Sequence, residues 1–229
     1  MKKQYLWFVL LFSMVIASSC EKELEQIPLS TASKAAVFGS QHGLEMYVNS
    51  FYTILPGRKT NLDAMSDYLA VRTVPIFIQE GAFAATLSSE WTWTDLRNLN
   101  YFIVNCKDPA VDIDVRKNYL GIAKFFRAYF YFEKIKRFGD VPWVGKPLDV
   151  SDTDILYGGR DSRTLVMDSV LADINYACEN IRLTTDPTRS TITKYLAYAL
   201  KSRICLFEGT FRKYHTELNL QSTAAAWLS

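Results

Sequence analysis

Residues 115–143, VRKNYLGIAKFFRAYFYFEKIKRFGDVPW, limit the possible folds of this chain more than any other segment. Apolar residues recur there at helical spacing, and aromatic residues fill the remaining faces. The aromatic residues are Phe125, Phe126, Tyr129, Phe130, Tyr131 and Phe132. A helix that is apolar on nearly all sides must lie between neighbouring elements, and burying each aromatic side chain stabilises the fold by roughly 2–3 kcal/mol. Gly139 and Pro142 predict where this helix ends.

Helical periodicity recurs on both sides of the central segment. The further predicted helices span residues 40–55, 88–106, 162–182 and 193–208. Ser40 is expected to cap the first of them, and Gly209 to end the last before a loop over 210–221 and a new helix from Thr223. In the third, Asp173 is expected to face solvent. The pattern predicts an all-α fold of stacked antiparallel helix hairpins, although the spacing shows no clean repeat.

Residues 56–87 lack helical period and are rich in Gly, Pro, Thr and Asp, and residues 143–160 form a second long loop. Long irregular segments in a compact domain are usually functional or disordered. The fold is therefore expected to carry long irregular loops beside its helices.

The first 19 residues have the composition of a signal peptide. Lys2 and Lys3 precede an apolar stretch from Tyr5 to Ala17, which is short for a transmembrane span. Cys20 follows directly, so we expect a lipoprotein signal over 1–19, acylation of Cys20 and a tether over 20–39. The alternative is cleavage near Ser19 with an incidental cysteine.

Charge and motif content exclude several classes of function. Lys2 and Lys3 lie in the signal segment, and the remaining basic residues balance the 24 acidic ones, which argues against nucleic-acid binding. Cys106, Cys178 and Cys205 lack metal-site spacing and are expected to be small buried residues. His42 and His215 are the only histidines. No nucleophile elbow or phosphate loop is present, so no enzyme, metal or cofactor is predicted.

Several segments match one family pattern. The central helix reads A-x-F-x-R-A-Y-x-Y-F from Ala123 to Phe132, followed by RFGDVP at 137–142. Further matches are PLST at 28–31, NSFY at 49–52, WTDLRNLNYFI at 93–103, GRDSRTLV at 159–166 and TKYLAYALKSRICL at 193–206. These residues resemble the SusD/RagB family of nutrient-binding outer-membrane lipoproteins. Leu165 departs from the pattern, since many members have glutamate there.

The resemblance implies a tetratricopeptide-like arrangement of the helices and a non-catalytic function. It implies an outward-facing lipoprotein of the cell outer membrane that binds glycans or peptides and delivers them to a SusC-like TonB-dependent transporter. Members are typically more than twice as long as this chain. Residues 40–229 are therefore expected to be the N-terminal helical domain, with the C-terminal half of the family missing.

Candidate ligand-binding residues lie in the irregular segment and at the helix entry after it, where Ser88 or Ser89 is expected to be the cap. They are Asp63, Asp67, Arg72, Trp91 and Trp93. Flat aromatic side chains can pack on the apolar faces of sugars, and charged side chains can bind their hydroxyl groups. The alternative is that the tryptophans anchor the core and the charged residues only solvate the surface.

Two other functions remain open from the sequence. One is a helical-repeat scaffold of the cell envelope that binds no small ligand. The other is an anchored hydrolase that uses a pair of carboxylates, although no pair stands out in the sequence.

Overall fold

The computed structural model describes residues 33–57, 66, 68, 72–81, 84, 87 and 90–229. The α-helices in these ranges are α2 (Lys34–Phe38), α3 (Gln41–Asn49), α4 (Thr94–Asn105), α5 (Ile113–Phe138), α6 (Thr153–Leu156), α7 (Arg163–Asn180), α8 (Lys194–Tyr214) and α9 (Gln221–Leu228). Short 3₁₀ helices are η2 (Ser50–Ile54), η4 (Ile76–Ile78) and η6 (Thr216–Leu218). The described residues contain no β-strand, only an isolated bridge between Val141 and Asp161. The all-α prediction is confirmed.

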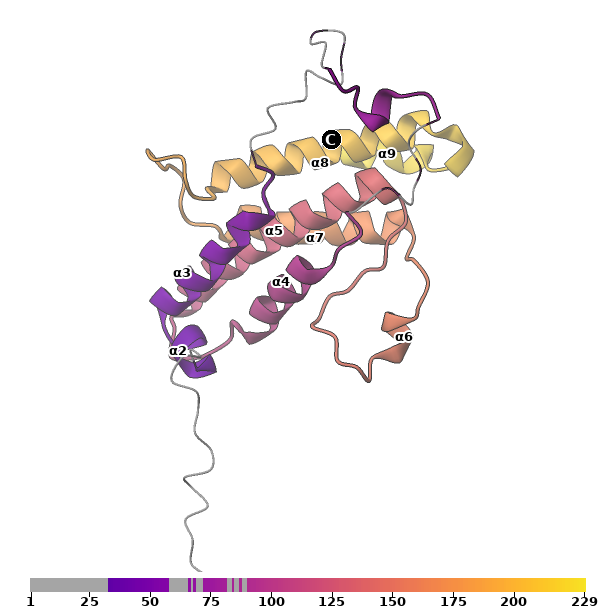
Figure 1. Cartoon of the computed structure of the whole chain (residues 1–229). Coiled ribbons are helices and arrows are strands. Elements are labelled where there is room, and N and C mark those ends of the chain that lie inside the picture. The colour runs from indigo at the N-terminus through magenta and orange to yellow at the C-terminus, as the bar shows by residue number, and fades with distance from the viewer. Residues whose placement is uncertain are drawn as a thin grey trace, which may run out of the picture. The chain divides into compact units, whose positions relative to one another are not determined.

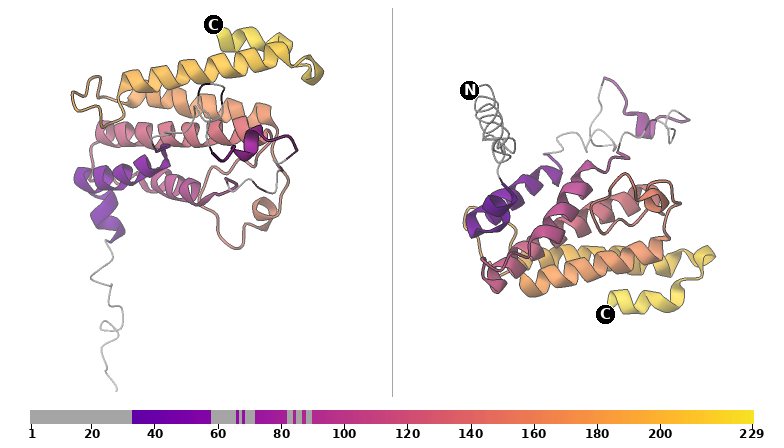
Figure 2. Two further views of the ribbon diagram at one scale, coloured as in Figure 1. Left: turned by 45° about the horizontal axis from the view of Figure 1, so that its top comes forward. Right: turned by 90° about the horizontal axis from the view of Figure 1, so that it is seen from below.

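Helix α5 lies at the centre of the bundle (Figure 1). It packs most extensively against α7, while α3 and α4 cover another side of it. Helix α8 packs on α7, and α9 packs on α8, so the C-terminal helices add successive layers (Figure 2). Consecutive long helices run in opposite directions. This arrangement confirms the predicted stack of antiparallel hairpins.

The aromatic segment of α5 forms the centre of the core, as expected. Five of its six aromatic side chains are at most 6% exposed, and Tyr129 is half-buried. Asp112 caps the helix, because its carboxylate accepts hydrogen bonds from the backbone N–H groups of Asp114 and Val115. Gly139 ends the helix with φ of +69°, a conformation that costs a glycine little.

Residues Ala35–Ser229 form one compact unit. Phe38 of α2 is buried, and its ring lies 5.8 Å from that of Phe102 and 5.7 Å from that of Tyr47. Residues 35–39, which the sequence assigned to the tether, thus pack with the helices. Ser40 caps α3, as predicted, by accepting a hydrogen bond from the Gly43 N–H at 3.1 Å. No helix within the described ranges is long and apolar enough to cross a bilayer.

Several helix boundaries differ from the prediction. The helix expected over 40–55 is α-helical only to Asn49 and continues as η2 to Ile54. The helix expected from residue 88 begins at Thr94, with Trp93 at the N-cap position, and the rings of Trp91 and Trp93 before it pack against α5. Ser88 and Ser89 lie outside the described residues. The prediction that Gly209 ends its helix was wrong. Helix α8 continues to Tyr214, well into the predicted loop.

Close packing of α9 explains the presence of Gly209. A Cβ atom at this position would lie 2.5 Å from side-chain carbons of Leu228 and 3.3 Å from the Cβ of Trp227. The glycine therefore lets two helices approach each other and does not terminate one of them.

Candidate ligand-binding site

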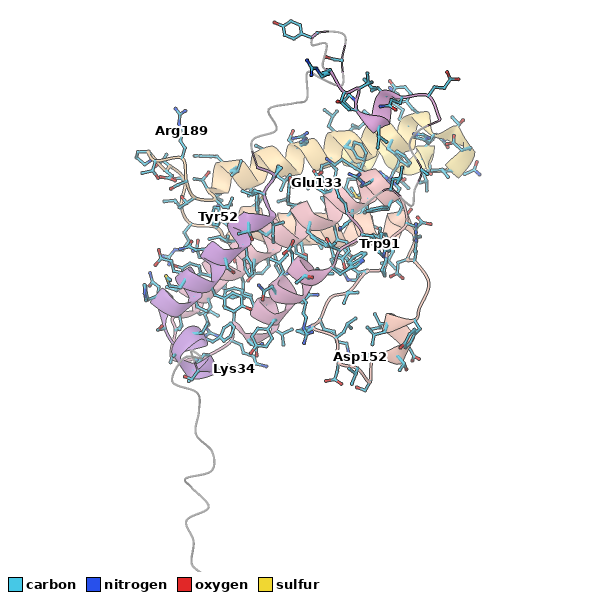
Figure 3. The ribbon with its side chains drawn as sticks, in the orientation of Figure 1. Lys34, Tyr52, Trp91, Glu133, Asp152 and Arg189 are labelled. Carbon is cyan, nitrogen blue, oxygen red and sulfur yellow. The ribbon has the colours of Figure 1, made fainter. Side chains whose placement is uncertain are left out.

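A cavity of about 780 Å³ lies between the start of α4 and the connector that joins α5 to α7. One wall consists of Trp91, Trp93 and the first turns of α4. The opposite wall comes from the connector between Pro142 and Arg160, which carries α6. Figure 3 shows Trp91 near the C-terminal end of α5 and Asp152 at the far side of the connector.

The two tryptophans lie edge to face at the cavity, with ring centroids 5.1 Å apart. Trp91 also packs on Phe138 of α5 at 4.8 Å and remains 39% exposed. Trp93 is half-buried and packs against Phe130 at 5.8 Å. Trp91 thus offers an accessible aromatic surface, and Trp93 fixes that surface to the core.

Lys134 anchors the segment just before α4. Its ammonium group donates a hydrogen bond to the carbonyl oxygen of Glu90 and lies 5.7 Å from the centroid of Trp93. Burial lowers the pKa of Lys134 from its ordinary value. Arg137 contributes a second anchor, since its guanidinium lies 2.7 Å from the Glu90 carboxylate. Both cations come from the last turns of α5, so the central helix positions the tryptophans.

A buried ion pair lies behind the cavity. Arg127 of α5 donates two hydrogen bonds to the Asp173 carboxylate of α7, at 2.6 and 2.9 Å. Lys124 donates a third, at 2.7 Å. Asp173 is 2% exposed, so the expectation that it faces solvent was wrong. A carboxylate can occupy this position because two cations and several hydrogen bonds offset its desolvation.

The same arginine holds the cavity wall in place through Asn100. Arg127 donates to the side-chain oxygen of Asn100 at 2.9 Å, and the Asn100 amide donates to the carbonyl oxygen of Val144 at 2.7 Å. The hydroxyl of Tyr131 accepts a hydrogen bond from the Val144 N–H at 2.7 Å. Burial raises the pKa of the Tyr131 hydroxyl well above its ordinary value. Together these contacts fix the connector backbone beside the α4 wall.

Charged side chains line the rest of the cavity. They are Arg97, Lys146, Asp149 and Arg160. Lys146 pairs with Asp152 at 2.6 Å, and this hydrogen bond lowers the pKa of the Asp152 carboxyl. Arg160 lies over the ring of Trp91, 4.8 Å from its centroid. The cavity therefore combines an aromatic surface with directional hydrogen-bond donors, the usual composition of a small-molecule site.

The residues predicted from sequence have different positions. Trp91 and Trp93 lie together in the cavity wall. Arg72 is exposed and does not line the cavity. Asp63, Asp67 and Cys20 lie outside the described residues. A ligand-binding role for these residues remains a prediction.

Sequence reasoning missed Arg97, Asn100, Lys146 and Arg160. A usable signal existed for two of them, since Trp93, Arg97 and Asn100 follow i, i+4, i+7 spacing and share one helix face. No local pattern indicates Lys146 or Arg160, because the connector's path decides where they lie.

Comparison with known proteins supports the resemblance seen in the sequence. No protein-family model matches the chain. The SusD-like protein P25 of Formosa agariphila is 22% identical to this chain, and the match covers 89% of this chain and 43% of that protein. A SusD homologue from Bacteroides thetaiotaomicron is 20% identical, with a TM-score of 0.59. The match covers 90% of this chain and 42% of the homologue's chain.

Two SusD-like structures from Bacteroides fragilis share the fold as well. One is 21% identical, with a TM-score of 0.57. The match covers 81% of this chain and 38% of that protein's chain. The other, a SusD-like carbohydrate binding protein, is 13% identical, with a TM-score of 0.53. That match covers 81% of this chain and 41% of the other protein's chain. This chain thus spans less than half the length of each relative. In the residues of α5 and in its stacked helical fold, the chain is thus similar to SusD-like proteins.

Proposed function

We propose that this chain belongs to a surface-exposed outer-membrane lipoprotein that binds glycans. The observation that carries the proposal is the cavity with Trp91 exposed in its wall. Its volume of about 780 Å³ is within the range of small-molecule sites. An indole face can pack on the C–H face of a pyranose, while arginine, lysine and amide groups bind the hydroxyls around it.

The family supports the rest of the proposal. A structural neighbour is described as a carbohydrate binding protein, and the sequence has a signal segment followed by Cys20. Acylation of Cys20 would tether the protein to the membrane, and ligand would then pass to a SusC-like TonB-dependent transporter. Peptides are the alternative ligand class. Recovery of a TonB-dependent transporter with the protein from native membranes tests the delivery step.

Replacing Trp91 tests glycan binding directly. In Trp91→Ala the aromatic surface is removed, while Trp93 keeps its contact with Phe130 and Lys134 keeps its hydrogen bond to the Glu90 carbonyl oxygen. Loss of one stacking contact is expected to weaken glycan binding by about tenfold. The measurement is retention on affinity gels that contain a panel of glycans.

Tyr195→Ala provides a matched control, since this aromatic residue is 63% exposed on α8 and does not line the cavity. It should leave retention unchanged, and circular dichroism should show both variants folded. Retention that is equal in Trp91→Ala and the unaltered chain would remove this cavity from the proposal.

A further inference from the structure

The charges around the cavity are unequal. Its lining contains three cations, Arg97, Lys146 and Arg160, and one carboxylate, Asp149. Lys146 is neutralised by Asp152. Within the described part of the chain, neither Arg97 nor Arg160 forms an ion pair with a carboxylate. Two guanidinium groups are therefore available to a ligand.

Carboxylates near these arginines are engaged elsewhere. Glu90 pairs with Arg137 at 2.7 Å. Asp140 accepts a hydrogen bond from the Arg163 N–H at 2.8 Å, and Asp161 accepts one from the Trp143 N–H at 2.7 Å. These carboxylates hold the connector in place and form no ion pair with Arg97 or Arg160. With Lys146 offset by Asp152 and one arginine offset by Asp149, the lining keeps a small excess of positive charge.

The geometry relates this charge to the aromatic surface. Arg160 lies over Trp91 with 4.8 Å between the guanidinium carbon and the ring centroid. Its side chain also reaches the carbonyl oxygen of Asp140 at 3.5 Å. Arg97 follows Trp93 by one helical turn, so it projects from the same face of α4. Arg160 covers part of the indole, so a sugar ring packed on the surface that it leaves free would have a guanidinium group beside it.

We propose that this cavity selects acidic saccharides, whose carboxylate or sulfate groups bind Arg97 and Arg160. The inference rests on the proposed glycan-binding function and adds a charge to the ligand. Guanidinium groups bind carboxylates and sulfates through paired, charge-assisted hydrogen bonds. Neutral sugars can use the aromatic surface and accept hydrogen bonds from the arginines, but they lack the stronger charge-assisted pairing. Both arginines are exposed, so their attraction should weaken as salt is added.

The test compares charged and neutral probes on the purified chain. Isothermal titration uses oligogalacturonate as the carboxylated probe, sulfated galactan oligosaccharides as the sulfated probe and neutral galactan oligosaccharides as the reference. The variants are Arg97→Gln and Arg160→Gln. Each is expected to weaken binding of at least one acidic probe by about tenfold and to weaken binding of the neutral probe clearly less, because glutamine still offers an amide N–H to sugar hydroxyls. Added salt should reduce the difference.

Arg189→Gln is the matched control, because this exposed arginine lies at the opposite end of the bundle from Trp91 (Figure 3). It should leave the affinity for all three probes unchanged. If the arginine variants weaken binding of oligogalacturonate, the arginines bind carboxylates. If they weaken binding of the sulfated oligosaccharides, the arginines bind sulfates.

Two results would overturn the inference, and they are distinguishable. Neutral probes that bind as tightly as acidic ones, with Trp91→Ala still weakening both, would end the acidic preference and leave the glycan-binding proposal standing. Absence of binding to every saccharide would overturn both the acidic preference and the glycan-binding proposal. Binding of an anionic peptide instead would show that the cavity is a peptide site.

Discussion

At the level of single residues, Arg127 has the largest structural role. It lies in the aromatic run of α5, is 6% exposed and binds Asp173, Asn100 and the Gly145 carbonyl oxygen. One side chain thereby links α5, α7, α4 and the connector. The position requires a planar group with several donors, which explains why arginine and not lysine occupies it.

Arg127→Met is expected to destabilise the protein strongly. It leaves the Asp173 carboxylate buried with fewer partners, and breaking a buried ion pair on one side typically costs about 3–5 kcal/mol. Denaturant unfolding measures the change in the free energy of unfolding.

A second substitution and a control identify the cause. Arg127→Met combined with Asp173→Asn should recover part of the loss, because the buried carboxylate is replaced by a neutral amide and the half-buried Lys124 can still reach solvent. Lys136→Met breaks the exposed pair with Glu133 and should cost less than about 1 kcal/mol. An effect of Arg127→Met as small as that of Lys136→Met would contradict the role assigned to the buried pair.

At the level of elements, the attachment of α9 to α8 depends on small and charged residues together. Gly209 allows close approach, and Arg212 lies 4.9 Å from the ring centroid of Trp227 while donating to the Thr223 hydroxyl at 2.9 Å. Glu208 is fully buried and binds Arg212 and Arg163. This cluster connects α7, α8 and α9 in one layered arrangement.

Gly209→Leu is expected to displace α9 from α8. The new side chain would overlap Leu228 and Trp227, and overpacking of this kind typically costs about 1–3 kcal/mol. Backbone amide exchange over residues 221–228 should accelerate, while exchange in α5 should stay slow.

Gly57→Leu is the matched control for this experiment. A Cβ at Gly57 meets no heavy atom within 4 Å, so exchange in α9 should not change. Slow exchange over residues 221–228 in Gly209→Leu would show that the contact with Gly209 does not hold α9.

For the whole molecule, the proposed attachment to the membrane depends on Cys20, which lies outside the described ranges. Cys20→Ser removes the thiol that acylation needs. We expect the unaltered protein to incorporate labelled palmitate in its host and to sediment with membranes, because several acyl chains give stable anchoring. The variant should lack the label and leave the membrane fraction. An unlabelled native protein would contradict the lipoprotein proposal.

Helix type, order and core residues followed from the sequence. The aromatic segment of α5 could be assigned because periodicity and composition are local properties, and a helix apolar on all sides has to be buried. Ser40 and Gly139 were also assigned correctly, since caps depend on adjacent residues. The same local patterns selected Trp91 and Trp93 as exposed candidates near a helix start.

Only the tertiary structure decided the other features of the site and of the helix ends. Asp173 has the sequence environment of a surface residue, and its burial depends on Arg127, a residue 46 positions away in the chain. Gly209 continues a helix because α9 folds back on it. Arg160 reaches Trp91 because the connector returns to α4. Local sequence determines periodicity and caps, whereas the pairing of distant charges and close helix contacts depends on how the chain folds back on itself.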